Sequence, residues 1–345
     1  MNLEKVKLSE YTSLKLGCEC DLVRIKNEEE LVEALMYAKS EGFRVHVLGE
    51  GTNTFFSNDL KNILVLKMEM KGIGVKKYGV RSTEEGEIRN IEDVFITAKA
   101  GEIFDDLVNL STKNNWWGIE NLSYIPGTVG ASPVQNIGTY GVELKDVLDY
   151  VRAYDTQENK FVEFKNEDCG FGYRDSLFKK ESGRYIICDI TLKLSKNENA
   201  KLDYKPLDSL KEKENLTPRD VRELVIKTRT EKLPDYKKFP NAGSFFKNVI
   251  VTKEKFEELQ KIYPDIKFFE EGENIKIPTA WFIENVAEMK GVQIGNVGTS
   301  QTQPLVLINY GANDAQELFD FEKIIIDKIF EKTEINIERE VNYIF

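Results

Sequence analysis

Two stretches of the chain combine glycines with small polar residues in a way that suits a phosphate-bearing ligand. The first is GEGTN at 49–53, where Gly49 and Gly51 follow an alternating, strand-like segment. Glycines in such a turn let backbone N–H groups approach a phosphate closely. The missing third glycine and the lack of a helical pattern after the turn argue against a Rossmann dinucleotide site. A tight hairpin turn without a ligand is the alternative.

The second stretch, SYIPGTVGASPVQNIGTYGVEL at 123–144, intersperses glycines with hydroxyl and amide side chains. Many N–H donors with little side-chain bulk suit a pyrophosphate, or a flat ring lying on the backbone. A long irregular loop inside a compact domain is usually functional. The alternative is a loop with a purely structural role.

The chain has one histidine and four cysteines in 345 residues, which excludes several kinds of site. A metal cluster built on histidines is impossible, and His46 lies in a strand-like segment, where we expect a structural role. Cys18 and Cys20 form C-x-C, whereas Cys169 and Cys188 are isolated, so the paired spacing of zinc sites is absent. We therefore predict no metal site.

Three further side chains could take part in catalysis, although each has a plainer explanation. Arg174 lies in GYRDSLFK beside Asp175, and an exposed ion pair is the common arrangement for such neighbours. Ser244 in NAGSFFKN is not part of a G-x-S-x-G nucleophile turn, and a loop hydroxyl that caps its own backbone is the alternative. Glu340 and Glu338 in INIEREVNYIF would share one face of a strand, and two carboxylates so spaced are typical of a solvent-facing surface.

The motifs GEGTN, IPGTVGASPVQNIGTYGVEL, GYRDSLFK and NAGSFFKN, in this order, closely resemble the UDP-N-acetylenolpyruvoylglucosamine reductase (MurB) family. The resemblance extends from about Leu14 to the C-terminus, and it places the chain in the vanillyl-alcohol-oxidase-like FAD-binding superfamily. It implies a cytoplasmic oxidoreductase of bacterial peptidoglycan synthesis that uses NADPH and non-covalently bound FAD. The implied reaction reduces UDP-N-acetyl-3-O-(1-carboxyvinyl)-glucosamine to UDP-N-acetylmuramate.

The same resemblance implies catalytic roles and cofactor contacts. Ser244 would be the general acid that protonates the substrate carbanion, while Arg174 and Glu340 would stabilise the enolate-like charge. Family members commonly have Pro directly before this Glu, where this chain has Arg339. The residues implied to bind FAD come from the two glycine-containing stretches: Gly49, Glu50, Gly51, Thr52, Asn53, Ile125, Pro126, Gly127, Thr128, Gly130, Ala131, Ser132, Gln135, Asn136, Gly138 and Tyr140.

Substrate contacts are implied for five more residues. Tyr204 in LDYKPL matches, by its spacing from GYRDSLFK, a loop that closes a Tyr over the UDP portion in one class of the family. Lys232 in EKLPD suits a pyrophosphate partner, because an ammonium group acts as a mobile point charge. The remaining contacts are Tyr173, Asn248 and Gln303.

Two other functions stay open at this point. One is another FAD-dependent oxidase or dehydrogenase of the same superfamily, and the other is a UDP-sugar-binding protein without catalysis. NAGSFFKN and the terminal EREV favour the reductase.

The pattern of apolar residues predicts the elements that position these motifs. Mixed helical and strand patterns indicate an α+β fold. The resemblance implies that it consists of a two-domain FAD-binding module of the PCMH/VAO type plus a C-terminal α+β substrate-binding domain. The expected divisions are 1–70 and 71–233 for the two FAD subdomains, 234–331 for the substrate domain, and 332–345 for a terminal strand that carries Glu340.

Turn and capping signals give the boundaries of individual elements. Asn27 and Gly42 bracket a helix, Thr217 and Pro218 begin another, and Asn313 is expected to cap a third. Antiparallel strands are expected at 147–155, 160–164 and 184–194, a charged, exposed hairpin at 71–93, a loop at 234–248 and a strand at 335–345.

The composition limits the possible partners. The formal net charge of −11 argues against a general nucleic-acid binder, whose affinity depends on neutralising phosphates. No apolar run approaches the ~20 residues of a membrane span, and the N-terminus lacks the apolar region of a secretory signal. We expect a monomer in the cytoplasm, with no membrane or nucleic-acid partner.

Overall fold

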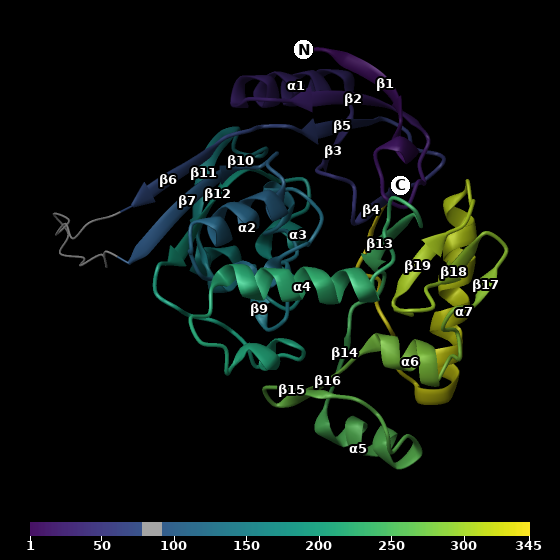
Figure 1. Cartoon of the computed structure of the whole chain (residues 1–345). Coiled ribbons are helices and arrows are strands. Elements are labelled where there is room, and N and C mark those ends of the chain that lie inside the picture. Colours follow the sequence, from purple (N-terminus) through teal and green to yellow (C-terminus); the bar gives the residue numbers. More distant parts are fainter. Residues whose placement is uncertain (78–91) are drawn as a thin grey trace. The chain divides into compact units, whose positions relative to one another are not determined.

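The computed structural model describes residues 1–77 and 92–345, and the chain divides into two compact units (Figure 1). Most of the N-terminal two thirds forms the first unit, whereas the second unit combines the C-terminal part with two short N-terminal segments. The first unit comprises residues 1–5, 21–50 and 62–231, and the second comprises residues 6–20, 51–61 and 232–345.

The first sheet of the first unit has the strand order β1-β2-β5-β3, and β5 pairs in parallel with both β2 and β3. Helix α1 covers this sheet through the buried side chains of Leu31, Ala34 and Ala38. As predicted, the Asn27 side chain caps α1, accepting a hydrogen bond from the Glu30 N–H at 2.8 Å. The elements are β1 (Leu3–Lys7), β2 (Glu19–Ile25), α1 (Glu28–Glu41), β3 (Arg44–Leu48) and β5 (Ile63–Met68).

The second sheet of this unit is antiparallel throughout, in the order β11-β10-β12-β7-β6. The three antiparallel strands predicted for the middle of the chain are thereby confirmed. Strands β6 and β7 pair as the predicted hairpin at 71–93 requires, although residues 78–91 lie outside the described residues. The strands are β6 (Ile73–Lys77), β7 (Asp93–Lys99), β10 (Leu148–Asp155), β11 (Lys160–Lys165) and β12 (Tyr185–Ser195).

Helices and a small hairpin complete the first unit. Helix α2 (Phe104–Lys113) buries Phe104, Leu107 and Val108 in one apolar cluster with side chains of β7, β10 and β12. Pro218 begins α4 as predicted, and the Thr217 hydroxyl accepts a hydrogen bond from the Asp220 N–H at 3.3 Å. The other elements are β8 (Gly138–Thr139), β9 (Val142–Glu143), α3 (Leu177–Lys180) and α4 (Pro218–Lys232).

In the second unit, the sheet β13-β19-β18-β17 lies beside the smaller sheet β14-β16-β15, and the C-terminal strand β20 pairs in parallel with β4. The strands are β4 (Thr54–Phe56), β13 (Asn241–Ser244), β14 (Val249–Val251), β15 (Phe269–Glu271), β16 (Asn274–Ile277), β17 (Gln293–Ile294), β18 (Val297–Thr299), β19 (Val306–Asn309) and β20 (Asn342–Ile344). The helices are α5 (Lys253–Ile262), α6 (Thr279–Asn285) and α7 (Ala315–Thr333).

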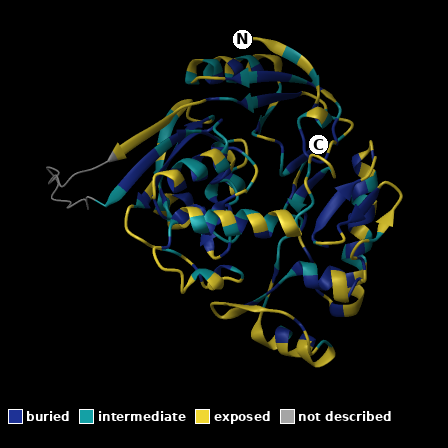
Figure 2. Cartoon of the chain, viewed as in Figure 1, coloured by how far each residue is buried: buried dark blue, intermediate teal, exposed yellow. Residues whose placement is uncertain are grey.

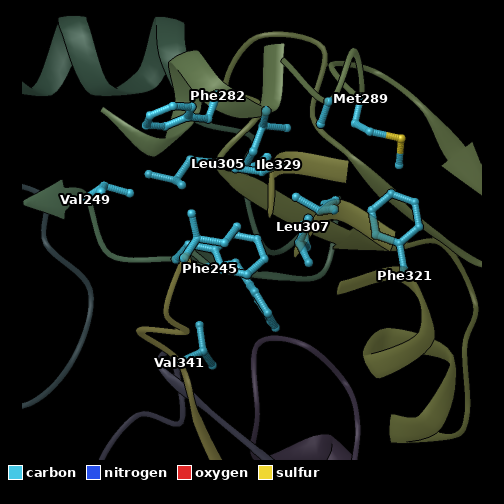
Figure 3. Close-up of a cluster of buried hydrophobic side chains, with 14 of the residues drawn as sticks. Phe245, Val249, Phe282, Met289, Leu305, Leu307, Phe321, Ile329 and Val341 are labelled. Carbon is cyan, nitrogen blue, oxygen red and sulfur yellow. The ribbon is translucent and has the colours of Figure 1, made fainter. Parts of the chain in front are cut away.

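One buried apolar cluster holds the second unit together, and strands β18 and β19 are buried within it (Figures 2 and 3). Helix α7 contributes one apolar face, with Leu318, Phe321, Ile325 and Ile329 all buried. Phe245 and Val341 belong to the same cluster, so the residue that directly follows Ser244 and the one that directly follows Glu340 are both anchored in a close-packed interior.

Three local predictions for this unit were wrong. The side chain that caps α7 is Asp314, which accepts from the Gln316 N–H at 2.9 Å, rather than Asn313. The expected loop at 234–248 contains strand β13, and the expected strand at 335–345 is reduced to β20. The residues before β20 still alternate in burial, because Ile335 and Ile337 insert into the apolar cluster. They do not take part in the pairing of β20 with β4.

No helix within residues 1–77 and 92–345 is both long enough and apolar enough to cross a membrane.

Candidate active site

The GEGTN turn connects β3 to β4, and its surroundings explain both glycines. The parallel pairing of β3 and β5 excludes the tight hairpin considered for this turn. A Cβ atom at Gly49 would lie 2.5 Å from the Thr128 hydroxyl oxygen, and one at Gly51 would lie 2.0 Å from the Tyr11 carbonyl oxygen. Gly51 also has a φ of 65°, which side chains disfavour. The backbone of the turn therefore packs directly against two other segments.

The contact at Gly49 brings together the two stretches that the sequence analysis assigned to FAD. Thr128, in the second stretch, is buried against the first. Gly130 shows the same close packing, since a Cβ atom there would lie 2.6 Å from the Ala100 Cβ, and its N–H donates to the Ala100 carbonyl at 2.9 Å. Glycine-lined backbone at two adjacent loops is the arrangement that fits a pyrophosphate.

Lys67 supplies a positive charge at this turn, and the sequence analysis missed it. Its ammonium group donates to the Gly49 carbonyl and lies 3.7 Å from the Glu50 carboxylate. Burial lowers the pKa of Lys67, partly offset by the Glu50 carboxylate. A single lysine within the apolar strand NILVLKM was the available signal.

The residues of the second stretch differ in how far they are buried. Asn136 and Ser132 are buried and bond to protein: Asn136 Nδ2 donates to Glu143 Oε2 at 2.9 Å, and the Ser132 hydroxyl donates to the Val129 carbonyl at 2.6 Å. These two side chains hold the shape of the loop. The exposed or half-buried members are Ile125, Pro126, Gly127, Gly130, Ala131, Gln135 and Gly138.

Arg174 lies in a tight turn of the first unit, and its backbone has a φ of 53°, which is uncommon for a non-glycine residue. Its guanidinium donates to the Gly138 carbonyl at 2.8 Å and lies 5.4 Å from the ring centre of Tyr173. The neighbouring Asp175 pairs with Lys180 at 3.0 Å. The turn therefore directs Arg174 toward the second glycine-containing stretch. The ion pair considered between Arg174 and Asp175 is replaced by one between Asp175 and Lys180.

Tyr204, the predicted lid residue, contacts this same stretch. Its ring meets the ring of Tyr140 edge-on, with 5.6 Å between the ring centres. Burial raises the pKa of both hydroxyl groups. Tyr204 is nevertheless 42% exposed, so its ring lies over the loop rather than inside the core.

Arg229 on α4 is a second cation of this region that the sequence analysis missed. Its Nε donates to the Tyr124 carbonyl at 3.3 Å, and it interacts electrostatically with Tyr140 and Arg174. Burial lowers its pKa. In the sequence it was one of several basic residues along α4, with no signal that set it apart.

Ser244 ends β13 in the second unit, directly after a disruption of the strand ladder. Asn241 and Ser244 pair with Ile308 and Val306 of β19, with a register shift between them. Gly243 has a φ of 71°, and its N–H donates to the Asn241 side chain at 2.9 Å. Bulges of this kind redirect a side chain and are common beside active sites.

Glu340 lies next to the strand that ends at Ser244. The Glu340 N–H donates to the Phe245 carbonyl at 2.8 Å, and Arg339 forms an isolated bridge with Phe246. Glu338 instead points to solvent and pairs with Lys247 at 2.9 Å. The structure therefore brings Ser244 and Glu340 together within one unit, although 335–341 is not a regular strand.

The substrate residues predicted for the second unit gather near the same strands. Asn248 Oδ1 accepts from the Thr279 N–H at 3.2 Å, and the Gln303 carbonyl accepts from the Val306 N–H at 2.9 Å. The Lys232 carbonyl accepts from the Thr302 hydroxyl at 2.8 Å, which ties Lys232 to the loop that carries Gln303.

The site residues divide between the units as follows. Arg174, Tyr173 and Tyr204 belong to the first unit with Gly49, Glu50 and the second stretch, whereas Gly51, Thr52, Asn53, Lys232, Ser244, Asn248, Gln303 and Glu340 belong to the second.

Cys20, Cys169 and Cys188 are buried, whereas His46 and Cys18 keep part of their surface exposed. Burial lowers the pKa of His46, on β3, to about 4, which keeps its imidazole neutral at physiological pH. Burial raises the pKa of Cys169 and of Cys188 to about 12, so neither forms a reactive thiolate. Within the described ranges, no group of three or more His, Cys, Asp or Glu side chains is arranged to hold a metal ion.

Glu120 leads to a prediction about pH and stability. Burial raises the pKa of this carboxyl group from 4.5 to about 7, although its Oε2 accepts from the Gly118 N–H at 2.6 Å. The folded state therefore holds a proton that the unfolded state releases, so stability falls as pH rises from about 4.5 to about 7. We expect Glu120→Gln to remove this loss, which amounts to about 3 kcal/mol.

The measurement is thermal unfolding of both proteins across that pH range. The advantage of the glutamine variant should grow with pH up to about 7 and then stay constant. Glu158→Gln, on the exposed surface of the same unit, is the matched control and should leave the pH profile unchanged. Parallel profiles for Glu120→Gln and the unsubstituted chain would contradict the prediction.

Comparisons with known proteins agree with this arrangement. A family model described as the FAD binding domain matches residues 22–164. A model of the UDP-N-acetylenolpyruvoylglucosamine reductase C-terminal domain matches residues 234–344. These matches confirm the expected FAD-binding module followed by a C-terminal domain.

Similar proteins cover nearly the whole chain. The UDP-N-acetylenolpyruvoylglucosamine reductase of Flavobacterium johnsoniae is 38% identical over 329 residues, which is 93% of each chain. That of Pseudomonas aeruginosa is 37% identical and covers 98% of this chain and 99% of its own. The crystal structure of MurB from Thermus caldophilus has the same fold, with a TM-score of 0.66 at 20% identity and full coverage of both chains. The chain therefore belongs to the UDP-N-acetylenolpyruvoylglucosamine reductase family.

Proposed function

We propose that Ser244, Arg174 and Glu340 carry out the proton-transfer and charge-stabilising part of the reductase reaction that defines this family. The chain reduces the enolpyruvyl group of UDP-N-acetyl-3-O-(1-carboxyvinyl)-glucosamine and yields UDP-N-acetylmuramate, a step of bacterial peptidoglycan synthesis. FAD is the cofactor and NADPH the reductant.

FAD, when bound, would supply the hydride-transfer chemistry that links NADPH to the enolpyruvyl group. The turn at 49–53 and the stretch at 125–140 would hold its phosphates and ring through their backbone. The close packing at Gly49 and Thr128 supports this assignment, because it makes one continuous surface of the two loops. Lys67, which donates to the Gly49 carbonyl, would add a positive charge at the turn that holds the pyrophosphate.

Arg174 would neutralise the charge that develops on the substrate carboxylate as C2 becomes an enolate carbon. A guanidinium keeps its charge at every working pH, and its planar fork matches a carboxylate. The hydrogen bond to the Gly138 carbonyl holds the side chain in one place, so little reorganisation is needed in the transition state.

Ser244 would donate its hydroxyl proton to C2 of the enolpyruvyl group, and Glu340 would contact that same enolpyruvyl group. A carboxyl group stabilises an enolate only as a hydrogen-bond donor, so Glu340 would act in its protonated form. The observation that carries this proposal is the 2.8 Å hydrogen bond from the Glu340 N–H to the Phe245 carbonyl. Phe245 directly follows Ser244, so this bond holds the backbone of Glu340 beside that of Ser244.

The experiment that tests the function is NADPH oxidation by the purified, flavin-loaded protein with and without the enolpyruvyl substrate. We expect oxidation that depends on the substrate and the formation of UDP-N-acetylmuramate. We also expect acid or heat denaturation to release all of the flavin into the filtrate. Flavin that stays with the precipitated chain would overturn non-covalent binding, and NADPH oxidation without product would overturn the reductase assignment.

Tyr204→Phe should weaken binding of the UDP substrate while FAD is still reduced by NADPH at a normal rate. Phe keeps the ring contact with Tyr140, so the loop keeps its packing and only the hydroxyl is lost. Losing one hydrogen bond costs about 0.5–1.5 kcal/mol, which corresponds to a rise in KM of about 2- to 12-fold.

Tyr310→Phe is the matched control, since Tyr310 is 43% exposed and Tyr204 is 42% exposed. In steady-state kinetics, the substrate KM should rise in Tyr204→Phe and should stay at the value of the unsubstituted protein in Tyr310→Phe. An unchanged substrate KM in Tyr204→Phe would mean that this loop does not close over the UDP portion.

We also propose that the protein is a cytoplasmic monomer with no membrane or nucleic-acid partner. Its acidic net charge of −11 and its four cysteines, none of which forms a disulfide, support this. The division into FAD subdomains 1–70 and 71–233, a substrate domain at 234–331 and a terminal segment at 332–345 is likewise proposed. Light scattering coupled to size-exclusion chromatography would test the oligomeric state.

A further inference from the structure

Arg339 directly precedes Glu340 and makes an ion pair with Glu322 of α7. Its Nε lies 2.9 Å and 3.1 Å from the two carboxylate oxygens of Glu322, and its Nη2 also donates to Oε2. Only 5% of the Glu322 side chain is exposed, and 27% of the Arg339 side chain is. This is a two-pronged contact on a buried carboxylate, which constrains both the position and the orientation of the guanidinium.

Three aromatic rings lie near the guanidinium. Its central carbon lies 4.8 Å from the ring centre of Phe319 and 5.9 Å from those of Phe55 and Phe245. Phe55 also packs on Phe319 and Phe245, with ring centres 5.6 Å and 6.4 Å apart. Arginine favours such a setting, because its flat cation stacks on aromatic faces while its edge binds a carboxylate.

Contacts to two neighbouring segments hold the backbone here. On one side the Glu340 N–H donates to the Phe245 carbonyl and the Lys247 N–H donates to the Glu338 carbonyl. On the other side Asn53 Nδ2 donates to the Glu340 carbonyl, and the ladder with β4 begins at Asn342. The side chain of Arg339 therefore adds a third direction of restraint, from helix α7, to a peptide that is otherwise tied to two neighbouring strands.

We propose that Arg339 is a positioning residue for Glu340: its ion pair with Glu322 fixes the direction in which the Glu340 carboxyl group points. Successive side chains of an extended segment point to opposite sides, so anchoring Arg339 toward α7 turns Glu340 away from it. This inference rests on the proposed role of Glu340.

A contribution to stability alone explains the pair less well. Burying two charges costs desolvation energy, and replacing such a pair by apolar residues of similar volume is often neutral or stabilising. A rigid, charged contact at this place instead offers a fixed geometry, and small misplacements of a catalytic group slow reactions strongly.

The test is the double variant Arg339→Met/Glu322→Leu, which removes both charges and leaves neither partner unpaired. We expect thermal unfolding close to that of the unsubstituted protein, since an apolar pair fills the same space. Reoxidation of the reduced flavin by saturating substrate should become about 10- to 100-fold slower. Flavin reduction by NADPH and the substrate KM should stay within about 2-fold, since neither depends on the enolate.

Two further variants test whether the geometry of this particular ion pair matters. Arg339→Lys keeps the charge but loses the planar fork, so its reoxidation rate should lie between those of the double variant and the unsubstituted protein. Lys323→Met/Asp327→Leu removes an exposed ion pair from the same helix and is the matched control, with both half-reactions unchanged.

The outcomes separate this inference from the proposed function. If Glu340→Ala is reoxidised normally, the role of Glu340 fails, and the inference fails with it. If Glu340→Ala is slow but the double variant is reoxidised normally, only the positioning role is overturned. It is also overturned if the double variant loses flavin reduction, reoxidation and thermal stability together, because the pair is then purely structural.

Discussion

Replacing Ser244 by Ala is expected to leave reduction of FAD by NADPH close to its normal rate and to slow reoxidation by the enolpyruvyl substrate by about 10²–10⁴-fold, the usual contribution of general acid catalysis. The reason is that a proton donor to the substrate carbon has no role while the flavin is being reduced. Stopped-flow absorbance of the flavin band records both steps, so the first step is an internal control for the second.

Ser244→Cys is the chemical control for this prediction. A thiol can still donate a proton, so the Cys variant should be reoxidised faster than the Ala variant. Water is a poor replacement for either group, because a closed site excludes it. The bulge at Gly243 makes the position tolerant of such a change, since it directs the side chain without relying on a hydrogen bond from the hydroxyl itself.

Two results would require another assignment. Reoxidation of the Ala variant at the normal rate would make Ser244 an ordinary hydroxyl at the end of β13. Loss of the reduction step instead would mean that Ser244 serves the nicotinamide or the placement of the flavin.

Much of the fold could be predicted because local signals determine it. Asn27 and Gly42 bound α1, and Thr217 with Pro218 begins α4, since a capping side chain and a fixed φ act within one turn of a helix. The antiparallel strands of the middle block were predicted from segments rich in β-branched and aromatic residues. Family resemblance then supplied the candidate roles, which composition and spacing left open for Arg174, Ser244 and Glu340.

Contacts between distant parts of the sequence could not be predicted. Asn53 and Glu340 are 287 residues apart, yet Asn53 Nδ2 donates to the Glu340 carbonyl at 3.5 Å in a unit that joins N-terminal and C-terminal segments. The pairing of β4 with β20 shortens the predicted terminal strand, because only three residues have a partner there. Lys67 and Arg229 were missed for the same reason: a lysine or arginine has no distinctive spacing until folding brings it to a carbonyl group.

The other large effect is expected for Gly51→Ala in the GEGTN turn. Its Cβ atom would lie 2.0 Å from the Tyr11 carbonyl oxygen and 3.1 Å from the Thr12 Cα, and both of these are backbone atoms that cannot rotate away. The Ser13 N–H donates to the Gly51 carbonyl at 3.0 Å, so the two segments cannot separate without losing that bond. Adding the strain of a side chain at a φ of 65°, we expect a loss of about 2–5 kcal/mol in stability.

Gly42→Ala is the matched control, because Gly42 has a similar φ of 73° but no atom lies within 4 Å of its Cβ position. This variant should lose only the backbone term, about 1–2 kcal/mol. Thermal unfolding measures the two losses, and the flavin content after desalting shows whether the turn still holds the cofactor. Gly51→Ala should lower both the thermal stability and the flavin content, whereas Gly42→Ala should lower the thermal stability alone. Equal losses in the two variants, with flavin retained in both, would mean that the turn yields to the extra methyl group and that its close packing against Tyr11 is not what shapes the phosphate site.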